Sequence, residues 1–271
     1  MSKSPNHPVL YEVRPGCFRA TLGADLEANA RALRELEVIE PALERRVILS
    51  RDFDFSPRQL QFVAAREWIT AMAYEAPPGV RPEQYFAGMP SLASLVVEQD
   101  CIDLSSWRAL RHVTLGCGNS VSSLRLPATL ESCEVWGLTD IVLEALRECQ
   151  DLVRLVIKGT SISDISPLAM LSRLSKLEIG AGRRLADLAP LGTLKELDFL
   201  EIAECPKVRD WSFLSLLPKL RRVFIMNCRE VDLDRLQFNA DIEQIFCFEC
   251  RVRGDVTALA SRYPLARITI D

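Results

Sequence analysis

The chain has few residues whose type and spacing suit catalysis. Among its 271 residues the only histidines are His7 and His112. General acid–base and nucleophilic chemistry require a partner that orients such a side chain, and neither histidine has one at a recognisable spacing. The sequence also contains no G-x-x-x-x-G-K-[ST], no G-x-G-x-x-G after a predicted strand and no H-E-x-x-H. We therefore expect a protein that is not an enzyme and that holds no cofactor.

Two cysteines have a spacing found in metal and redox sites, because Cys247 and Cys250 form a C-x-x-C. A zinc site of this type needs a second such pair, and none follows at a suitable distance. Unpaired cysteines are also among the side chains most often buried. We therefore predict structural roles for this pair and no metal site, with metal or redox chemistry as the alternative.

The composition narrows the class of protein further. Apolar residues make up 48% of the chain, which predicts a globular fold, and the net charge of −4 argues against a nucleic-acid-binding protein. No run of about 18 apolar residues occurs, and the N-terminus has no apolar stretch, so we expect neither a membrane span nor a signal peptide. Nine cysteines in such a chain predict reduced thiols and a cytoplasmic location.

The pattern L-x-x-L-x-L, in which other apolar residues replace some leucines, recurs along most of the chain. The six clearest copies close at positions 22 or 23 residues apart, namely Ile157, Ile179, Ile202, Ile225, Cys247 and Ile270. Looser copies close at Val97, Leu115 and Val135, and one further copy at Tyr74. A fixed period of this length indicates a repeat architecture.

These repeats resemble the leucine-rich repeat family over roughly residues 69–271. The segment "ISDISPLAMLSRLSKLEI" is similar to the 22-residue repeats of internalins and of phosphatase-regulating proteins. The chain departs from the family in its shortened upstream repeats and in lacking Asn at most of the usual positions after the strand. The resemblance implies an α/β fold, a right-handed leucine-rich repeat solenoid with a curved parallel sheet on its concave face and short helices or turns on its convex face.

The mixed spacing has a physical explanation in such a fold. The closing alternation is a short strand with two apolar side chains pointing inward, and the segment that follows returns along the other side. Pro167, Pro190 and Pro218 suit that return and would be poor in a central strand. We expect about nine or ten repeats over residues 69–271, which share one continuous core. Family repeats place Asn or Cys in the turn after the strand, so Cys205, Cys228 and Cys250 are predicted to bond neighbouring backbone there.

Residues 1–68 show no clean repeat. We predict a helix that begins after Asp25 and runs to about Val38, a strand at 45–50, and a second helix that a Ser56–Gln59 capping box begins and that ends near Ala65. We interpret residues 1–68 as an α/β capping region that covers the first repeat, because the ends of a solenoid need a cover. A separate functional module is the alternative.

Apolar side chains gather on the predicted outward face near the C-terminal end of the repeats. The alternation places Phe199, Phe224, Met226, Phe246 and Phe248 outward, with Arg222 and Glu201 beside them. A contiguous apolar patch with arginine is typical of an interface. The alternative is a register error of one residue, because "FIMN" and "IFCFE" are apolar throughout. Outward positions on neighbouring strands add Trp136 and Glu178 to the candidate surface.

The loops after the strands carry basic residues at similar positions in four repeats, among them Arg183, Arg229 and Arg251. Stacked repeats would align them as a basic ridge that attracts an acidic partner. Ordinary solvated loops, with these arginines paired to Glu204, Glu230 and Glu249, are the alternative.

These features predict a non-catalytic module that binds another protein on its concave face, as an inhibitor or an immunity-type neutraliser. The expected partner is a protein, with no nucleic acid and no membrane. A homodimer through the C-terminal edge strand is a further hypothesis. The alternative function is that of an exported pathogen effector or an adhesion-type leucine-rich repeat protein.

Overall fold

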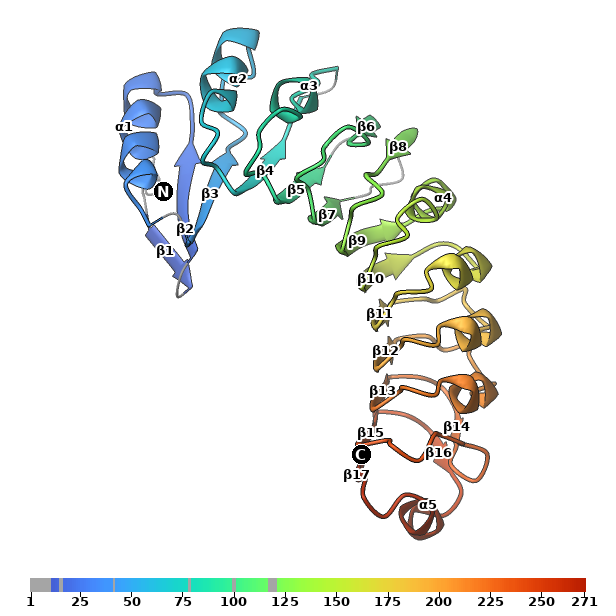
Figure 1. Ribbon diagram of the computed structural model, residues 1–271. Helices are drawn as coiled ribbons and strands as arrows, with labels where there is room; N and C mark the ends of the chain where they lie inside the picture. The colour runs from blue at the N-terminus through green and yellow to red at the C-terminus, as the bar shows by residue number, and fades with distance from the viewer. Residues whose placement is uncertain (1–10, 15–16, 41, 78, 99–100, 117–120) are drawn as a thin grey trace, which may run out of the picture. The chain divides into compact units, whose positions relative to one another are not determined.

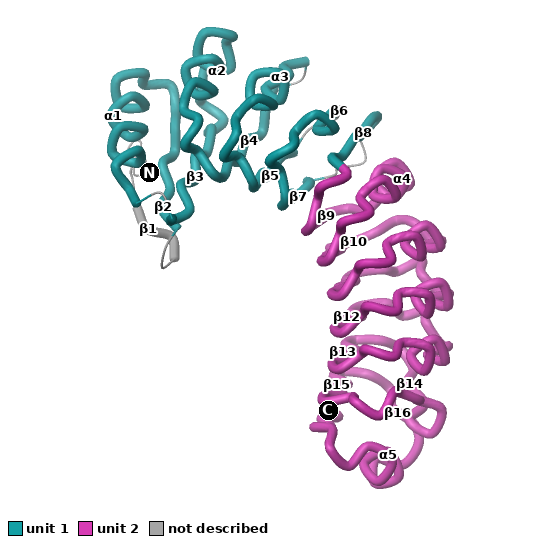
Figure 2. The backbone as a smooth tube through the Cα atoms, in the orientation of Figure 1, with its two compact units in different colours: residues 1–116, 120–127 teal, residues 117–119, 128–271 magenta. Residues whose placement is uncertain are grey.

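The computed structural model describes residues 11–14, 17–40, 42–77, 79–98, 101–116 and 121–271 (Figure 1). The chain divides into two compact units (Figure 2). Unit 1 comprises residues 1–116 and 120–127, and unit 2 comprises residues 117–119 and 128–271.

The described residues of unit 1 form six strands of a sheet, each next to the following one. They are β1 (Tyr11–Arg14), β2 (Cys17–Leu22), β3 (Glu44–Leu49), β4 (Ala71–Glu75), β5 (Ser94–Glu98) and β7 (His112–Gly116). β1 and β2 are antiparallel, whereas every later pair is parallel. A separate parallel pair is formed by β6 (Cys101–Asp103) and β8 (Ser123–Arg125).

The helices of unit 1 connect these strands. They are α1 (Leu26–Glu37), α2 (Pro57–Ala64) and α3 (Glu83–Phe86). The Asp25 side chain accepts a hydrogen bond from the Ala28 amide and begins α1, as predicted. The predicted capping box of α2 is wrong, because the Ser56 hydroxyl makes no cap hydrogen bond and donates instead to Asp54. The helix itself and the strand β3 are confirmed.

Unit 2 contains seven parallel strands in chain order. They are β9 (Ser132–Leu138), β10 (Arg154–Thr160), β11 (Lys176–Gly180), β12 (Phe199–Ala203), β13 (Arg222–Met226), β15 (Gln244–Phe248) and β17 (Arg267–Ile270). Equivalent residues of successive repeats are direct neighbours, so that Leu177 pairs with Leu200 and Leu200 with Val223. Residues at the same position of successive sequence repeats are therefore paired side by side in the sheet.

Short helices return the chain on the side opposite the strands in unit 2 (Figure 1). They are α4 (Asp140–Leu146), η1 (Ser166–Met170), η2 (Ala189–Thr193), η3 (Ser212–Leu216) and α5 (Val256–Arg262), while β14 (Val231–Asp232) and β16 (Val252–Arg253) form a small parallel pair. Pro167 and Pro190 lie in the first turn of η1 and η2, where a missing amide hydrogen is tolerated. An aspartate precedes each 3₁₀ helix and accepts an amide hydrogen bond, such as that from Ser212 to Asp210 at 2.9 Å.

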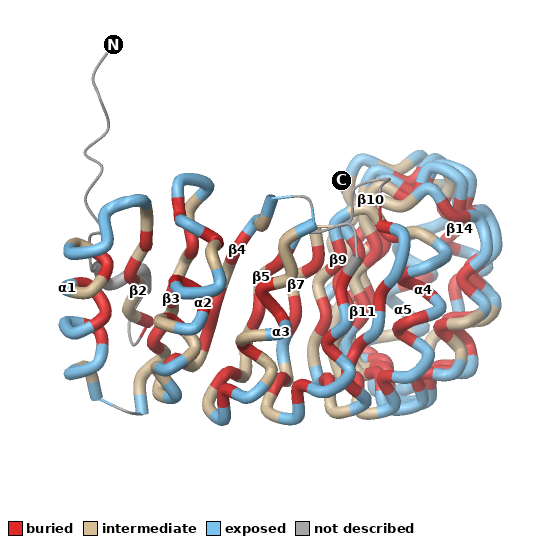
Figure 3. The backbone as a smooth tube through the Cα atoms, turned by 90° about the horizontal axis from the view of Figure 1, so that it is seen from above, coloured by how far each residue is buried: buried red, intermediate tan, exposed pale blue. Residues whose placement is uncertain are grey.

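The core of unit 2 lies between the strands and the returning helices. Buried and half-buried residues alternate along β12, β13 and β15, and the inward residues Leu200, Val223 and Ile245 have no exposed area. Figure 3 shows in red the buried positions that recur along the strands. No repeat encloses these side chains alone, so stacking of repeats stabilises the fold.

Each of four successive turns after a strand holds a residue in the left-handed backbone region. These are Ala181, Glu204, Asn227 and Glu249, whose φ angles are 54°, 53°, 50° and 50°. Each residue donates its amide hydrogen to a carbonyl of the next strand or just beyond it, for example Glu204 to Met226 at 3.0 Å. The turn geometry therefore continues the ladder of backbone hydrogen bonds past the strands.

The cysteines of these turns bond to neighbouring backbone, as predicted. The Cys228 thiol donates to the Ile202 carbonyl at 3.7 Å, and the Cys250 thiol donates to the Ile225 carbonyl at 3.5 Å. Cys205 donates to the carbonyl of Ala203 at 3.3 Å. Cys247 is fully buried in the core. The C-x-x-C is thus built into the packing of two adjacent repeats.

Residues 1–68, interpreted above as a cap, contribute β2 and β3 to the sheet of unit 1. β3 pairs in parallel with β4, with Val47 opposite Met72 and Leu49 opposite Tyr74. These four side chains are buried. The boundary at residue 68 falls between α2 and β4, and the capping role of the first segment stays a prediction.

Candidate functional site

Four phenylalanine rings follow one another across the outer face of three strands in unit 2. The centroids of Phe199 and Phe224 are 5.4 Å apart, and those of Phe224 and Phe246 are 5.5 Å apart. Phe246 and Phe248 stack at 6.1 Å on the same strand. We call Phe199, Phe224, Phe246 and Phe248 the aromatic ladder. Its rings lie at the distances at which aromatic side chains attract one another.

The ladder lies on the face of the sheet that is opposite the core. Val223, Ile225, Ile245 and Cys247, which alternate with its members, have no exposed area. The four phenylalanines and Met226 are half-buried by comparison. The predicted outward orientation is therefore confirmed, and the alternative of a one-residue register error is wrong. In these stretches every residue is apolar, so the orientation of the phenylalanines could be predicted only from the register with neighbouring strands.

Charged side chains adjoin the ladder on its β11 and β12 side. The guanidinium of Arg222 lies 5.1 Å from the centre of the Phe199 ring, a cation–π geometry. Glu201 is the register neighbour of Phe224 on one side and of Glu178 on the other. Burial, and in second place the charge of Glu178, raise the pKa of the Glu201 carboxyl. The structure thus brings Glu178, Glu201 and Arg222 together with the ladder, as the sequence predicted.

Trp136 belongs to a different cluster of the same face. It is 55% exposed, and its indole nitrogen donates to Glu134 at 2.7 Å. The ammonium of Lys158 lies 2.8 Å from the same carboxylate and 5.5 Å from the Trp136 ring. Although burial alone would raise it, the hydrogen bonds from Lys158 and Trp136 lower the pKa of Glu134. Two strands, β10 and β11, lie between Trp136 on β9 and Phe199 on β12, so Trp136 is not part of the ladder.

One apolar residue at an outward position of β10 is buried. Val156 lies between Glu134 and Glu178 in the strand register and is 2% exposed. Its side chain is shorter than those of the two glutamates beside it. Val156 is therefore an apolar position on β10 between two paired cations, Arg154 and Lys158.

The predicted basic ridge is partly neutralised by carboxylates. Arg183, Arg229 and Arg251 are exposed, whereas Arg209 and Arg253 both form ion pairs with Glu230, at 2.5 and 2.8 Å. Glu230 was one of the partners foreseen in the alternative of ordinary solvated loops. The role of Arg183, Arg229 and Arg251 in binding stays a prediction.

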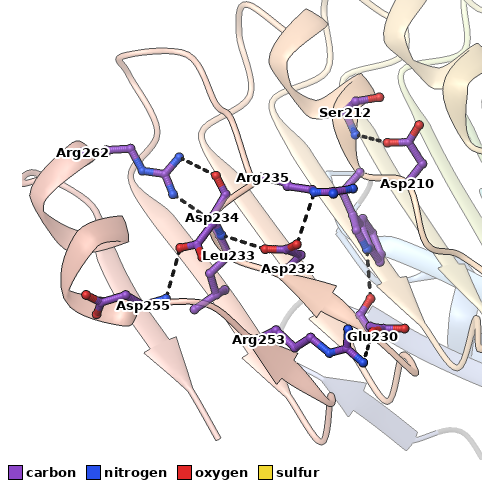
Figure 4. A network of polar contacts seen from close by, with 11 residues as sticks. Asp210, Ser212, Glu230, Asp232, Leu233, Asp234, Arg235, Arg253, Asp255 and Arg262 are labelled. Carbon is purple, nitrogen blue, oxygen red and sulfur yellow. Dashed lines mark hydrogen bonds and ion pairs between the residues drawn. The ribbon is translucent and has the colours of Figure 1, made fainter.

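Residues of these loops also line a cavity of about 610 Å³ that the sequence did not predict, and Figure 4 shows the polar contacts among several of them. Its lining is Arg209, Asp210, Trp211, Ser212, Glu230, Asp232, Arg235 and Arg253. Asp232 pairs with Arg235 at 3.4 Å, and Trp211 donates to the Glu230 carbonyl at 3.3 Å. The regular spacing of Asp187, Asp210 and Asp232 could have indicated these ordered loops. Each aspartate accepts a hydrogen bond from the backbone amide two residues further along the chain. These contacts hold the loops in shape.

Residues suited to chemistry are scattered. His112 is exposed on β7, and His7 lies outside the described residues. Within the part of the chain that the structure describes, no three His, Cys, Asp or Glu side chains are placed to hold a metal ion. Hydrogen bonding with Cys228 lowers the pKa of Cys250 below its usual value. None of the described helices has the length and apolar character needed to cross a membrane.

Comparison with known proteins places the fold. No family model and no curated protein matches the sequence. A leucine-rich repeat protein of Leptospira interrogans matches 87% of this chain and 62% of its own, with 12% identity and a TM-score of 0.57. A chain of the mouse RP105/MD-1 complex matches 93% of this chain and 54% of its own, with 16% identity and a TM-score of 0.50. An internalin of Listeria monocytogenes matches 92% of this chain and 85% of its own, with 15% identity and a TM-score of 0.49.

The parallel sheet and the returning 3₁₀ helices agree with the likeness to the Leptospira leucine-rich repeat protein. The chain has the leucine-rich repeat fold, an open solenoid of repeats rather than a closed barrel.

Proposed function

We propose that the chain is a non-catalytic protein-binding module that holds its partner on the outer face of the sheet in unit 2, with the aromatic ladder at the centre of the interface. The observation that carries the proposal is the ladder itself. Its four rings contact one another on the face that the core does not use. Folding of the repeats requires only the inward residues, so aromatic rings on the outer face have no evident role in stabilising the core.

The composition of this surface supports a protein partner. Interfaces concentrate their binding energy in a few aromatic and arginine side chains, and Arg222 stacks on Phe199 at the edge of the ladder. Met226 lies beside the ladder and offers a flexible apolar contact. One of the matched solved structures is of a complex, which accords with binding by this fold.

The finer roles are part of the same proposal. The chain would act by masking or holding its partner, as an inhibitor or immunity-type neutraliser in the cytoplasm. The exported-effector hypothesis and the homodimer through β17 are alternatives. Genes that neighbour its own distinguish a toxin or enzyme target from an export cluster, and the mass of the purified protein in solution tests the homodimer.

Affinity capture from a lysate with single-residue variants tests the proposal. Phe224→Glu and Phe246→Glu place a charge within the ladder, so we expect each to weaken partner binding by at least about 2 kcal/mol, roughly thirtyfold. Met170→Glu is the matched control, because Met170 is 54% exposed on η1, away from the sheet face. Equal melting temperatures for all variants would show intact folds. Equal capture by the wild type and both ladder variants would remove the ladder as the site.

A further inference from the structure

Glu201 differs from the other glutamates on the outer face of unit 2. Glu134 pairs with Lys158 at 2.8 Å, and Glu178 pairs with Arg154 at 3.0 Å. The side chain of Glu201 makes no hydrogen bond or ion pair with any other described residue. It is nevertheless half-buried, and burial raises its pKa. A carboxylate in this position costs folding free energy, because its charged form is partly desolvated without compensation.

The surroundings of Glu201 combine negative charge with an aromatic wall. Its register neighbours are Glu178 on β11 and Phe224 on β13. Two positions along, Ala203 lies between Gly180 and Met226, so toward the turns β11 and β12 carry at most a methyl group here. A Cβ atom built on Gly180 would meet only the Ile157 carbonyl, at 3.7 Å. The carboxylate is therefore approachable past small residues, with an aromatic ring next to it.

Two of the cations nearest in the register are engaged elsewhere. Arg222 lies over Phe199, and Arg154 is paired with Glu178. Among the described residues, neither Arg222 nor Lys176 forms an ion pair with Glu201. The surface therefore offers an acceptor and an aromatic face without the cation that would complement both.

We propose that the partner protein inserts an arginine side chain at Glu201, with its guanidinium hydrogen-bonded to the carboxylate and stacked on Phe224, and that apolar side chains next to this arginine contact Met226, Phe246 and Phe248. The proposal rests on the proposed function of the ladder as an interface. A planar guanidinium can donate two hydrogen bonds to one carboxylate and stack on a ring at the same time, which an ammonium group does less well. The charge of Glu178 favours the same cation.

Selection from a random peptide library displayed on phage, with the immobilised full chain as bait, tests this inference. We expect the peptides whose binding Phe224→Glu abolishes to share an arginine flanked by apolar residues. Glu201→Gln should weaken these peptides at least about tenfold. Glu67→Gln, the same change at an exposed position of unit 1, should leave binding unchanged.

A double-mutant cycle shows whether Glu201 acts on the arginine itself. Citrulline, a neutral isostere, replaces the arginine of the best synthetic peptide. It should weaken binding to the wild type as much as Glu201→Gln does, and should have little further effect on the Glu201→Gln variant. Independent, additive effects of the two changes would show that Glu201 acts through another group such as Arg222, and would overturn the inference.

The outcomes separate this inference from the proposed function. Peptides that need Phe224 but lack arginine, prefer lysine, or bind the Glu201→Gln variant equally well refute the arginine while leaving the ladder as an interface. Peptides that ignore Phe224→Glu, or a selection without any binder, contradict the ladder as an interface and the inference with it.

Discussion

The carboxylate of Glu201 is half-buried between Glu178 and Phe224, and its raised pKa has a consequence for stability. Between the pKa of an unfolded glutamate, about 4.3, and the raised folded value, the folded chain binds more protons than the unfolded chain. The contribution of this group to the free energy of unfolding is therefore complete at low pH and declines as the pH rises through that window.

We accordingly expect Glu201→Gln to raise the melting temperature at pH 7, with the difference from the wild type vanishing near pH 4. Thermal melts of both proteins from pH 4 to pH 8 measure it. The charged groups around the site are Glu178, Arg154, Lys176 and Arg222, and none of them is changed in this comparison. A Glu201→Gln variant that is less stable than the wild type at pH 7 would show that Arg222 or Lys176 already compensates the charge.

At the residue scale, the orientation of the ladder residues could be predicted even where the local sequence shows no alternation of apolar and polar residues. In "FIMN" and "IFCFE" every position is apolar, yet the register carried from Leu177 and Leu200 placed Phe224 and Phe246 outward. The ion pairs could not be predicted from the sequence, because a long charged side chain can reach several neighbouring residues of opposite charge. Arg154 paired with Glu178, and Glu201 was left without a partner.

The turn after each strand is the element in which backbone conformation constrains sequence most. Glu204 has a φ of 53°, where a side chain with a Cβ atom costs about 1 kcal/mol and a β-branched one costs more. We expect Glu204→Gly to stabilise the chain slightly and Glu204→Val to destabilise it by about 1–2 kcal/mol. Urea unfolding measures both changes, with Lys207→Val as a control at an exposed position outside the left-handed region. Equal stabilities of the Gly and Val variants would contradict this account.

Prediction of elements succeeded where a repeat or a single cap determines them. The strands of unit 2 and α1 were foreseen, because inward residues recur and Asp25 caps the helix. α2 begins after Ser56 as predicted, but the capping hydrogen bond was mispredicted, since Asp54 accepts both the Ser56 amide and its hydroxyl hydrogen. The left-handed turns were not foreseen either, because Ala181, Glu204 and Glu249 are not residues that favour that region.

At the scale of the whole molecule, the predicted capping role of residues 1–68 can be tested by deleting them. Removing them would uncover the edge of β4 and expose Met72 and Tyr74, which are now 1% and 4% exposed. We expect residues 69–271 alone to lose cooperative thermal unfolding and to bind a hydrophobic dye. Circular dichroism and dye fluorescence measure this. A soluble fragment that melts cooperatively would reject the capping role and favour a separate module.

The register of unit 2 also has a consequence for how the outer face that carries the aromatic ladder can evolve. Since equivalent residues lie one strand apart, about 4.8 Å, recombination that copies residues 199–221 would add one rung to the ladder and leave every interior contact of the same kind. Gain or loss of one repeat therefore enlarges or reduces the outer face by one strand. Single outward residues can also be substituted without changes to the buried inward residues.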